Sequence, residues 1–384
     1  MYLVSVSRSD KCEDLLFIVV WVGVVELTGV GHSFESAGDV GVRWMGYPWS
    51  AEFSGRWESQ EIESESLKGN PLGDPYVRPT YIYVPPSYDK SDRRYPVVYV
   101  LQGMTGQVDM WWNRSAFRKT TPEAIDAVVA DPEVQDAIVV LVDAWTSYGG
   151  SQYLNSKGTG DYLDYVTKDV VEFVDSNYRT YPKASMRAVM GKSSGGYGAM
   201  VIPMLRPNVF GALATHAGDA AFEWSYATDI AQSARYLRDV FDGDYERFWT
   251  DFRSRPAFSK SYDASLSNVY AMAACYSTDQ DGTVRLPFDP SSGLIDDEVW
   301  SRWLSLDPVR MVKDHAEELS LLRGVWIDAG RSDEYFLDVG ARCYASRMES
   351  IGVSFHFELF EGRHGSIDYR YPMALRYLIG CLTD

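Results

Sequence analysis

A G-x-S-x-G pentapeptide, Gly191–Gly195, lies between a short apolar run typical of a strand, residues 186–190, and an apolar segment of helical length, residues 196–205. A serine in this pattern stands on a sharp strand-to-helix turn, in strained backbone geometry, with its hydroxyl exposed. Glycines at both ends let the strand and the helix approach each other, because a Cβ there would clash. The start of the helix directs backbone N–H groups at any anion that forms beside the serine. The pattern therefore predicts a nucleophile elbow with Ser193 as the nucleophile; the competing interpretation is a Gly/Ser-rich turn without a chemical role.

A serine nucleophile needs a base, and at a strand-turn-helix site of this kind the chain order is serine, acid, histidine. His364 follows the strand-like run 353–360 and has glycines on both sides of it, so a loop can present it at the edge of the sheet. We therefore predict that His364 is the base. The other four histidines are expected to have no catalytic role. His32 precedes the serine, His315 is expected to be exposed on a helix, and His356 lies within a strand; the fourth is His216.

The acid that orients this base is predicted to be Asp333, which lies three residues after Gly330 at the end of a strand-like run. Such an acid keeps the imidazole in the productive tautomer and stabilises the imidazolium without taking its proton. Two alternatives stay open, the adjacent Glu334 and Asp219, which follows another apolar strand. Asp328 lies inside a strand and is expected to be structural.

A β-branched and aromatic run, residues 96–101, leads into the glycine turn Gln102-Gly103-Met104-Thr105-Gly106. Hydrolases with a nucleophile elbow place one backbone N–H donor in such a turn and take the second from the residue after the nucleophile. We therefore predict that the backbone N–H groups of Met104 and Ser194 form an oxyanion hole. Removal of one such donor typically lowers the rate about a hundredfold or more.

Several segments of the chain resemble the esterase D family of α/β-hydrolases, which is similar to S-formylglutathione hydrolases, feruloyl esterases and mycolyltransferase antigens. These segments are Gly69-Asn70-Pro71-Leu72-Gly73-Asp74-Pro75, Arg78, Tyr83-Val84-Pro85-Pro86-Ser87-Tyr88 and Tyr95–Gly103. The resemblance extends from about residue 55 to the end and includes the elbow, the turn Gly330–Asp333 (the acid turn) and the loop Gly362–His364 (the base loop). It implies ester hydrolysis without a cofactor and names no substrate. Relatives often have Ser-Gly where this chain has His216-Ala217-Gly218-Asp219, so the details of their pockets do not carry over.

Strand-like and helix-like segments alternate along the chain, which predicts a mostly parallel sheet with helices on both faces. With the resemblance, this pattern predicts an α/β-hydrolase fold. Residues 1–54 are predicted to be an N-terminal extension and residues 55–384 the catalytic domain, with a helical cap at 219–308, where clean strands are missing and aromatic residues are frequent. Strands are expected at 80–84, 97–101, 138–142, 186–190, 211–215, 324–327 and 353–360, and helices at 121–130, 163–178 and 372–382.

Aromatic residues that follow strand ends are the candidates for contact with substrate, because ligands of open α/β sheets bind at the carboxyl ends of the strands. We expect six of them to line the acyl or alcohol pocket: Trp111, Trp112, Trp145, Tyr148, Trp224 and Tyr226. Most other aromatic residues of the cap segment are expected to form the cap's own core.

Acidic residues outnumber basic ones by 54 to 36, which gives a formal net charge of −18. Such a chain repels nucleic acid and anionic membrane surfaces, so neither is expected as a partner. Asp279-Gln280-Asp281-Gly282 resembles the start of a calcium loop but lacks the third acid and the closing glutamate, so no metal is expected there. The four cysteines are widely spaced and predict no disulfide framework. The expected partner is a small-molecule ester, and whether the chain forms a homo-oligomer is left open.

Residues 15–25 form an apolar run of eleven residues, which is shorter than the roughly twenty residues needed to span a bilayer. Acidic residues adjoin both of its ends, and no signal-peptide cleavage site follows closely. We interpret its β-branched part, residues 17–22, as a strand of a cytoplasmic protein. An uncleaved anchor or an export signal is the alternative.

These predictions combine into a serine carboxylic-ester hydrolase that works through a triad of Ser193, His364 and Asp333 and an acyl-enzyme intermediate. An acyltransferase would use the same residues with an alcohol or a sugar in place of water. A thioesterase of the S-formylglutathione hydrolase type would differ only in the leaving group. The sequence leaves both alternatives open.

Overall fold

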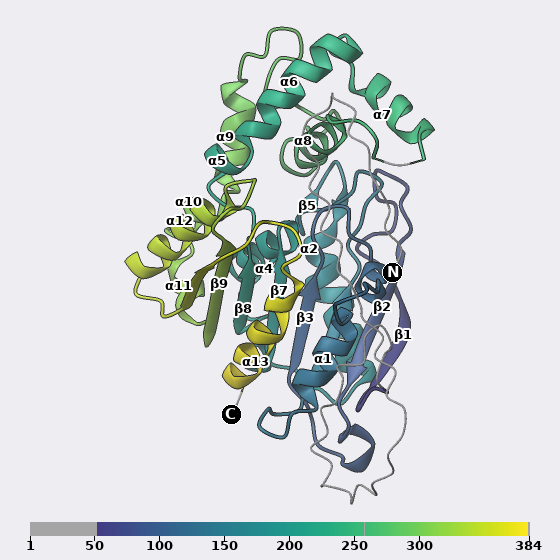
Figure 1. Cartoon of the computed structure of the whole chain (residues 1–384), viewed down its shortest axis with the longest axis vertical. Helices are drawn as coiled ribbons and strands as arrows, with labels where there is room; N and C mark the ends of the chain where they lie inside the picture. Colours follow the sequence, from purple (N-terminus) through teal and green to yellow (C-terminus); the bar gives the residue numbers. More distant parts are fainter. Residues whose placement is uncertain (1–51, 257, 383–384) are drawn as a thin grey trace, which may run out of the picture. The chain divides into compact units, whose positions relative to one another are not determined.

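The computed structural model describes residues 52–256 and 258–382 of the 384-residue chain. Its centre is an eight-stranded sheet in the order β1-β2-β4-β3-β7-β8-β9-β10 (Figure 1). β2 runs antiparallel to both of its neighbours, and all other neighbouring strands are parallel. The strands of this sheet are β1 (Arg56–Glu63), β2 (Val77–Val84), β3 (Val97–Leu101), β4 (Ile138–Val142), β7 (Arg187–Lys192), β8 (Ala212–His216), β9 (Gly324–Gly330) and β10 (His356–Phe360). A separate short hairpin pairs β5 (Asn155–Ser156) with β6 (Gly160–Asp161).

Both faces of the sheet are covered by helices, which explains why its central strands are continuous apolar runs. Because side chains alternate across a strand, Val98 and Val100 pack into the core under α1 and α13, whereas Val97, Tyr99 and Leu101 pack into the core of the opposite face. The predicted mostly parallel sheet with helices on both faces is therefore confirmed. One face carries α1 (Thr121–Val129) and α13 (Tyr371–Cys381); the other carries α2 (Tyr162–Asp164), α3 (Val171–Asn177), α4 (Ser194–Leu205), α10 (Pro308–Met311), α11 (Ala316–Ser320) and α12 (Leu337–Ser350). Short 3₁₀ turns occupy Tyr88–Lys90, Val108–Trp112, Ala184–Met186 and Asp368–Arg370.

Several elements differ from the sequence prediction: the hairpin β5–β6 and helix α12 were not predicted, and the strand predicted at 353–360 begins at His356. The segment 163–178, predicted as one helix, contains a π-helix at Tyr165–Val170 between α2 and α3. The sequence does not reveal the π-helix, because apolar residues three or four positions apart lie on one face of the segment with or without a single π-helical turn. β1 was not predicted at all: as an edge strand it alternates charged residues with few apolar ones, and most of its positions are not buried.

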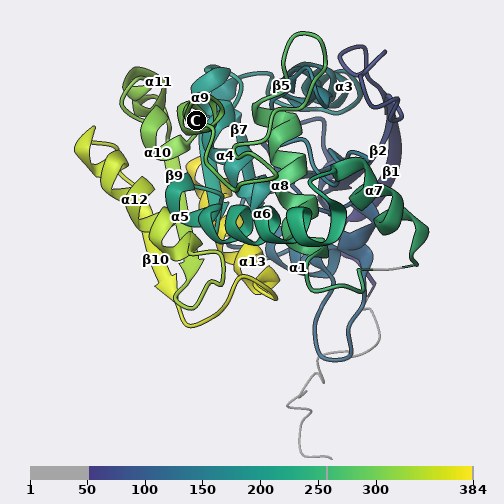
Figure 2. The ribbon, with the colours of Figure 1, turned by 90° about the horizontal axis from the view of Figure 1, so that it is seen from above.

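The segment between β8 and β9 is mostly helical, and we refer to the first five of its helices as the cap helices. Figure 2, viewed from above, shows α6, α7 and α8 lying over the sheet. Most cap aromatics pack against one another, as expected: Phe248, Trp249 and Trp303 are buried, whereas Trp224 and Phe258 are exposed. The cap helices are α5 (Phe222–Ser225), α6 (Ala227–Phe241), α7 (Tyr245–Ser254), α8 (Asp263–Tyr276) and α9 (Asp297–Ser305).

Within the described part of the chain, no helix has both the length and the apolar character that crossing a membrane requires. The apolar run 15–25, with its predicted strand, lies outside the described residues.

Asp328, in β9, is fully buried and ties together three parts of the fold. Its Oδ1 lies 2.7 Å from Nδ1 of His216, at the end of β8. Its Oδ2 accepts hydrogen bonds from the Trp326 indole N–H at 2.8 Å and from Nε of Arg370 at 3.0 Å. Burial opposes ionisation of this carboxyl, but the neighbouring His216 and Arg370 and the donated hydrogen bonds hold its pKa below the ordinary value. The contacts agree with the structural role predicted for Asp328.

We expect Asp328→Asn to lower the free energy of unfolding by about 3–5 kcal/mol, because removal of one partner of a buried ion pair leaves the other charge uncompensated. Urea denaturation followed by circular dichroism measures this change. Glu223→Gln is the control, because it removes the partner of Arg310 in a surface pair that contributes at most about 1 kcal/mol. A loss at Asp328 no larger than the control's would contradict the structural role.

Candidate active site

Ser193 occupies the turn between β7 and α4, where the elbow pattern places it. Its backbone angles, φ 57° and ψ −126°, lie outside the helical and extended regions. Such a conformation costs a residue with a side chain about 1–3 kcal/mol and persists only where the surroundings hold it. The Ser193 N–H is held by the carbonyl oxygens of His216 at 3.0 Å and Ala217 at 3.1 Å, at the end of β8. The strained turn is therefore fixed by the neighbouring strand.

Close packing explains the glycines at both ends of the elbow. A Cβ on Gly191 would lie 2.4 Å from the backbone of Gly195, and a Cβ on Gly195 would lie 2.4 Å from the carbonyl oxygen of Leu101 in β3. Gly103, just after β3, is also close, because a Cβ there would lie 3.3 Å from the carbonyl oxygen of Lys192. The turn after β3 is thereby brought against Ser193.

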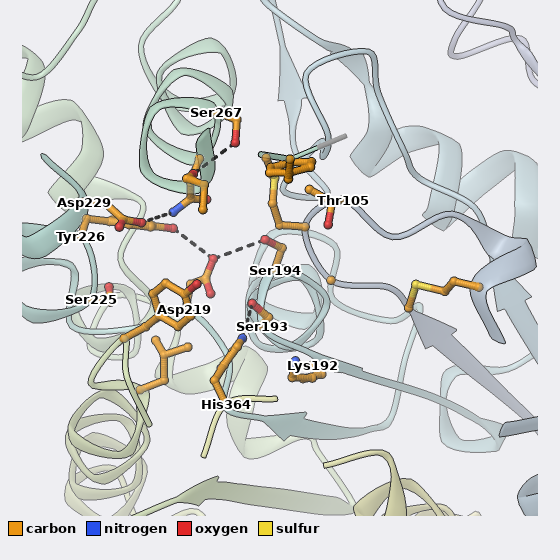
Figure 3. A pocket seen from close by; sticks show the side chains of 18 of the residues that line it. Thr105, Lys192, Ser193, Ser194, Asp219, Ser225, Tyr226, Asp229, Ser267 and His364 are labelled. Carbon is orange, nitrogen blue, oxygen red and sulfur yellow. Dashed lines mark hydrogen bonds between the residues drawn. The ribbon is translucent and has the colours of Figure 1, made fainter. Parts of the chain in front are cut away.

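His364 joins Ser193 to Asp333. Its Nε2 lies 3.1 Å from Oγ of Ser193, as the dashed line in Figure 3 marks, and its Nδ1 lies 2.9 Å from Oδ2 of Asp333. The second oxygen of Asp333 accepts the backbone N–H of Tyr335 at 2.9 Å. The Asp333 side chain is fully buried and that of His364 is 12% exposed. The three side chains thus form one hydrogen-bonded chain that ends at the serine hydroxyl.

The acid turn and the base loop meet because two glycines leave no side chains between them. A Cβ on Gly330 would lie 2.6 Å from the backbone of Gly362, and the Ser332 N–H donates to the Gly362 carbonyl at 3.0 Å. Glu334, the alternative acid, accepts the backbone N–H of His364 at 3.0 Å. Glu334 therefore holds the backbone of the base loop rather than the imidazole ring.

Two backbone N–H groups, those of Met104 and Ser194, belong to residues that line a cavity with Ser193. Ser194 is the first residue of α4, so its N–H has no partner within the helix. In the turn after β3, the N–H groups of Thr105 and Gly106 donate to nearby carbonyls, whereas no backbone acceptor for the Met104 N–H occurs among residues 52–256 and 258–382. Met104 and Ser194 line the same cavity as Ser193. This is the arrangement that the predicted oxyanion hole requires.

A cavity of about 400 Å³ opens at Ser193. Its walls come from the elbow, the turn after β3, the acid and base loops, and cap helices α6 and α8. Lys192, immediately before Ser193, is one of its charged residues; burial lowers the pKa of this ammonium, while nearby Asp368 and Asp333 oppose that effect. The cavity therefore combines polar and apolar walls beside the serine.

Asp219 lies buried in the cavity wall at the centre of a hydrogen-bond network (Figure 3). It accepts from Nε2 of Gln152 at 3.0 Å and from the Tyr226 hydroxyl at 3.1 Å, and the Ser194 hydroxyl lies 3.5 Å away. Burial raises the pKa of its carboxyl. No hydrogen bond joins Asp219 to His364 in the described part of the chain, so the geometry favours Asp333 over this alternative.

Only two of the six predicted pocket aromatics, Trp111 and Tyr226, line the cavity. The prediction that the other four line the pocket is wrong, because their side chains lie outside the cavity lining. Trp112 packs edge-on against Trp57 and Tyr81, and Tyr148 packs against Trp249 and Tyr270. Trp224 is 58% exposed, and Trp145 is half-buried outside the cavity lining.

The side chains of the other described histidines make their contacts elsewhere. His216 is buried against Asp328, and His356 stacks on Trp326 at a ring distance of 3.8 Å. His315, predicted to be exposed on a helix, is half-buried and occupies the position directly before α11.

Sequence reasoning missed several polar residues of the cavity. Lys192 could have been predicted to line the cavity, because it is the variable residue directly before the serine in the G-x-S-x-G pattern. Ser225, Asp229 and Asn268 belong to different cap helices, and no local pattern connects them. Asp229 and Asn268 are 39 residues apart in the chain, yet a hydrogen bond of 2.7 Å joins them.

Comparison with solved structures finds the same fold. A ferulic acid esterase matches with a TM-score of 0.55 and 18% identity, covering 86% of this chain and 100% of that one. An S-formylglutathione hydrolase from Agrobacterium tumefaciens matches with a TM-score of 0.51 and 16% identity, covering 87% and 98%. MPT51 of Mycobacterium tuberculosis matches with a TM-score of 0.52 and 17% identity, covering 85% and 99%. These likenesses confirm the predicted α/β-hydrolase fold.

Curated sequences match over shorter stretches. An esterase of Mycobacterium tuberculosis is 26% identical over 144 residues, which is 36% of this chain and 29% of the relative. The uncharacterized protein YbbA of Bacillus subtilis is 24% identical over 151 residues, which is 37% of this chain and 57% of the relative. The match thus spans less than two thirds of either relative's length.

The family whose description is "Putative esterase" matches residues 77–371 of the chain. That range runs from β2 to the start of α13 and includes the elbow, the acid turn and the base loop. This chain therefore belongs to the "Putative esterase" family of hydrolases.

Proposed function

We propose that the protein is a carboxylic-ester hydrolase in which Ser193 is the nucleophile, His364 the general base and Asp333 the acid that orients it. The observation that carries the proposal is the hydrogen-bonded chain from Asp333 to Ser193, with distances of 2.9 Å and 3.1 Å, at a cavity large enough for a small ester. Membership of an esterase family supports ester chemistry. It leaves the particular ester open.

In the acylation step, Nε2 of His364 takes the proton of the Ser193 hydroxyl while Oγ attacks the carbonyl carbon of the ester. The negative charge that develops on the carbonyl oxygen is stabilised by the N–H groups of Met104 and Ser194. When the tetrahedral intermediate collapses, His364 passes its proton to the leaving alcohol and the acyl group remains on Ser193.

In the deacylation step, His364 takes a proton from water, which attacks the acyl-serine carbonyl through a second tetrahedral intermediate. Collapse releases the acid and returns the proton to Oγ of Ser193. Asp333 stabilises the imidazolium in both steps, and the Tyr335 N–H holds the second oxygen of this carboxylate. Each step uses only groups of this chain, the ester and water.

We expect Ser193→Ala and His364→Ala each to lower kcat/KM on p-nitrophenyl acetate by several orders of magnitude with the fold retained, because triad members act as a unit. Labelling by a fluorophosphonate probe should disappear in Ser193→Ala. His356→Ala is the matched control, since this side chain stacks on Trp326 away from the cavity. Retention of more than about a tenth of wild-type activity in folded Ser193→Ala would refute the assignment.

The choice of acid is tested by three isosteric variants. Asp333→Asn should lower kcat/KM about a thousandfold or more, since its amide cannot hold the imidazole in the productive tautomer. Glu334→Gln should cost far less, because a glutamine oxygen can still accept the His364 backbone N–H. Asp219→Asn should mainly change KM, since this residue lies in the cavity wall. A near-normal Asp333→Asn beside a severely impaired Asp219→Asn would move the acid to the end of β8.

The proposal also predicts the product. With p-nitrophenyl acetate in water, the acyl group should appear as free acetate, and addition of a simple alcohol should change the product little. Chromatography of the products with and without the alcohol measures this. Acetylation of the alcohol as the main reaction would show that the chain is an acyltransferase that uses the same residues.

A further inference from the structure

We propose that the cap side of the cavity is a subsite for a primary ammonium group, so that the preferred esters carry an amine in their acyl or alcohol part. The subsite consists of Ser225, at the end of α5, Asp229, in the first turn of α6, and Asn268, on α8. This inference rests on the proposed ester hydrolysis and adds the chemical class of the substrate.

Asp229 is a buried carboxylate with room for a partner. Its side chain lines the cavity, and Oδ2 accepts one hydrogen bond, from Nδ2 of Asn268 at 2.7 Å. No Lys, Arg or His forms an ion pair with Asp229 among the described residues. Burial, and to a smaller degree the charge of Asp219, raises the pKa of this carboxyl. A buried charge without a counter-charge is costly, and a cation in the cavity would remove that cost.

A second and independent feature points to a ligand at the same place. The Ser225 side chain lines the cavity, the residue is only 5% exposed, and its hydroxyl has no hydrogen-bond partner in the described structure. Buried polar groups are normally hydrogen-bonded, so an unpartnered hydroxyl on a cavity wall indicates a polar group that belongs to the bound molecule. Figure 3 shows Ser225 and Asp229 on the cap side of the cavity, apart from Lys192.

The charges of the cavity favour a cation over a neutral polar group. Three carboxylates line it, those of Asp219, Asp229 and Asp368, against one ammonium, that of Lys192. Asp219 already receives hydrogen bonds from Gln152 and Tyr226, whereas Asp229 receives one, from Asn268. A primary ammonium has three N–H donors and a positive charge, so it can bind the free oxygen of Asp229 and the Ser225 hydroxyl together.

The described residues contain no group of three His, Cys, Asp or Glu side chains placed to hold a metal ion. A metal cation is therefore not the occupant that these residues fit. A hydroxyl group would satisfy Ser225 but would leave the charge of Asp229 without a partner.

The test compares esters that differ in one terminal group. The acyl series consists of the p-nitrophenyl esters of 6-aminohexanoic, 6-hydroxyhexanoic and heptanoic acid. The alcohol series consists of 5-aminopentyl acetate, 5-hydroxypentyl acetate and hexyl acetate. We expect the amino ester to exceed its methyl and hydroxyl analogues in kcat/KM by about tenfold or more in one series, as a charge-assisted hydrogen bond provides. Asp229→Asn should reduce that ratio by about tenfold. Asp239→Asn, at an exposed position of the same helix, should leave it unchanged.

A second measurement does not depend on turnover or on the variant's folding. Hexylammonium should bind the wild-type protein in calorimetry at least about tenfold more tightly than hexanol. Equal hydrolysis of amino and hydroxyl esters, or an amino preference that persists in folded Asp229→Asn, would overturn the subsite while ester hydrolysis stands. Binding of hexylammonium by a protein that hydrolyses none of the esters would instead refute the proposed function and keep the subsite.

Discussion

The close approach of β3, β7 and α4 at the elbow is the constraint on which the site depends. Gly191 and Gly195 are in contact, and Gly195 lies against the carbonyl of Leu101, so no side chain fits between the three elements. This packing forces Ser193 into a strained backbone conformation that its neighbours on β8 hold by hydrogen bonds. The same packing places the start of α4 and the turn after β3 beside the serine. One steric condition thus positions Ser193 and both N–H groups proposed to stabilise the oxyanion.

Two buried aspartates have different numbers of hydrogen-bond partners, and this difference distinguishes a structural residue from a proposed binding residue. Asp328 is surrounded by donors, from His216, Trp326 and Arg370, and these contacts join the sheet to the segment before α13. Asp229 has one donor and an open side towards the cavity. A fully paired carboxylate stabilises the fold, whereas an incompletely paired one on a cavity wall keeps binding capacity for a ligand. The contrast is the reason that we place the amine subsite on the cap and not beside β9.

Much of the site could be predicted from the chain because its members stand at the ends of recognisable strands. Ser193, Asp333 and His364 each follow an apolar run and a glycine, and the structure brings these three together. The pocket aromatics were predicted less well. Trp112 and Tyr148 follow strand ends too, but a position after a strand does not tell where a side chain on an irregular loop will pack. Four of six therefore lie away from the cavity.

By itself the sequence determined the fold class, the elbow and the order of the candidate catalytic residues, because these depend on local spacing: apolar runs, glycines that permit close approach, and polar residues just after strands. Only the tertiary structure shows which of two adjacent carboxylates bonds to the imidazole: Asp333 lies 2.9 Å from Nδ1 of His364, whereas Glu334 accepts the His364 backbone N–H. It also decided the polar side of the cavity. Asp229 and Asn268 come from helices that the cap folds together, and a contact between residues far apart in the chain leaves no local pattern for a sequence to display.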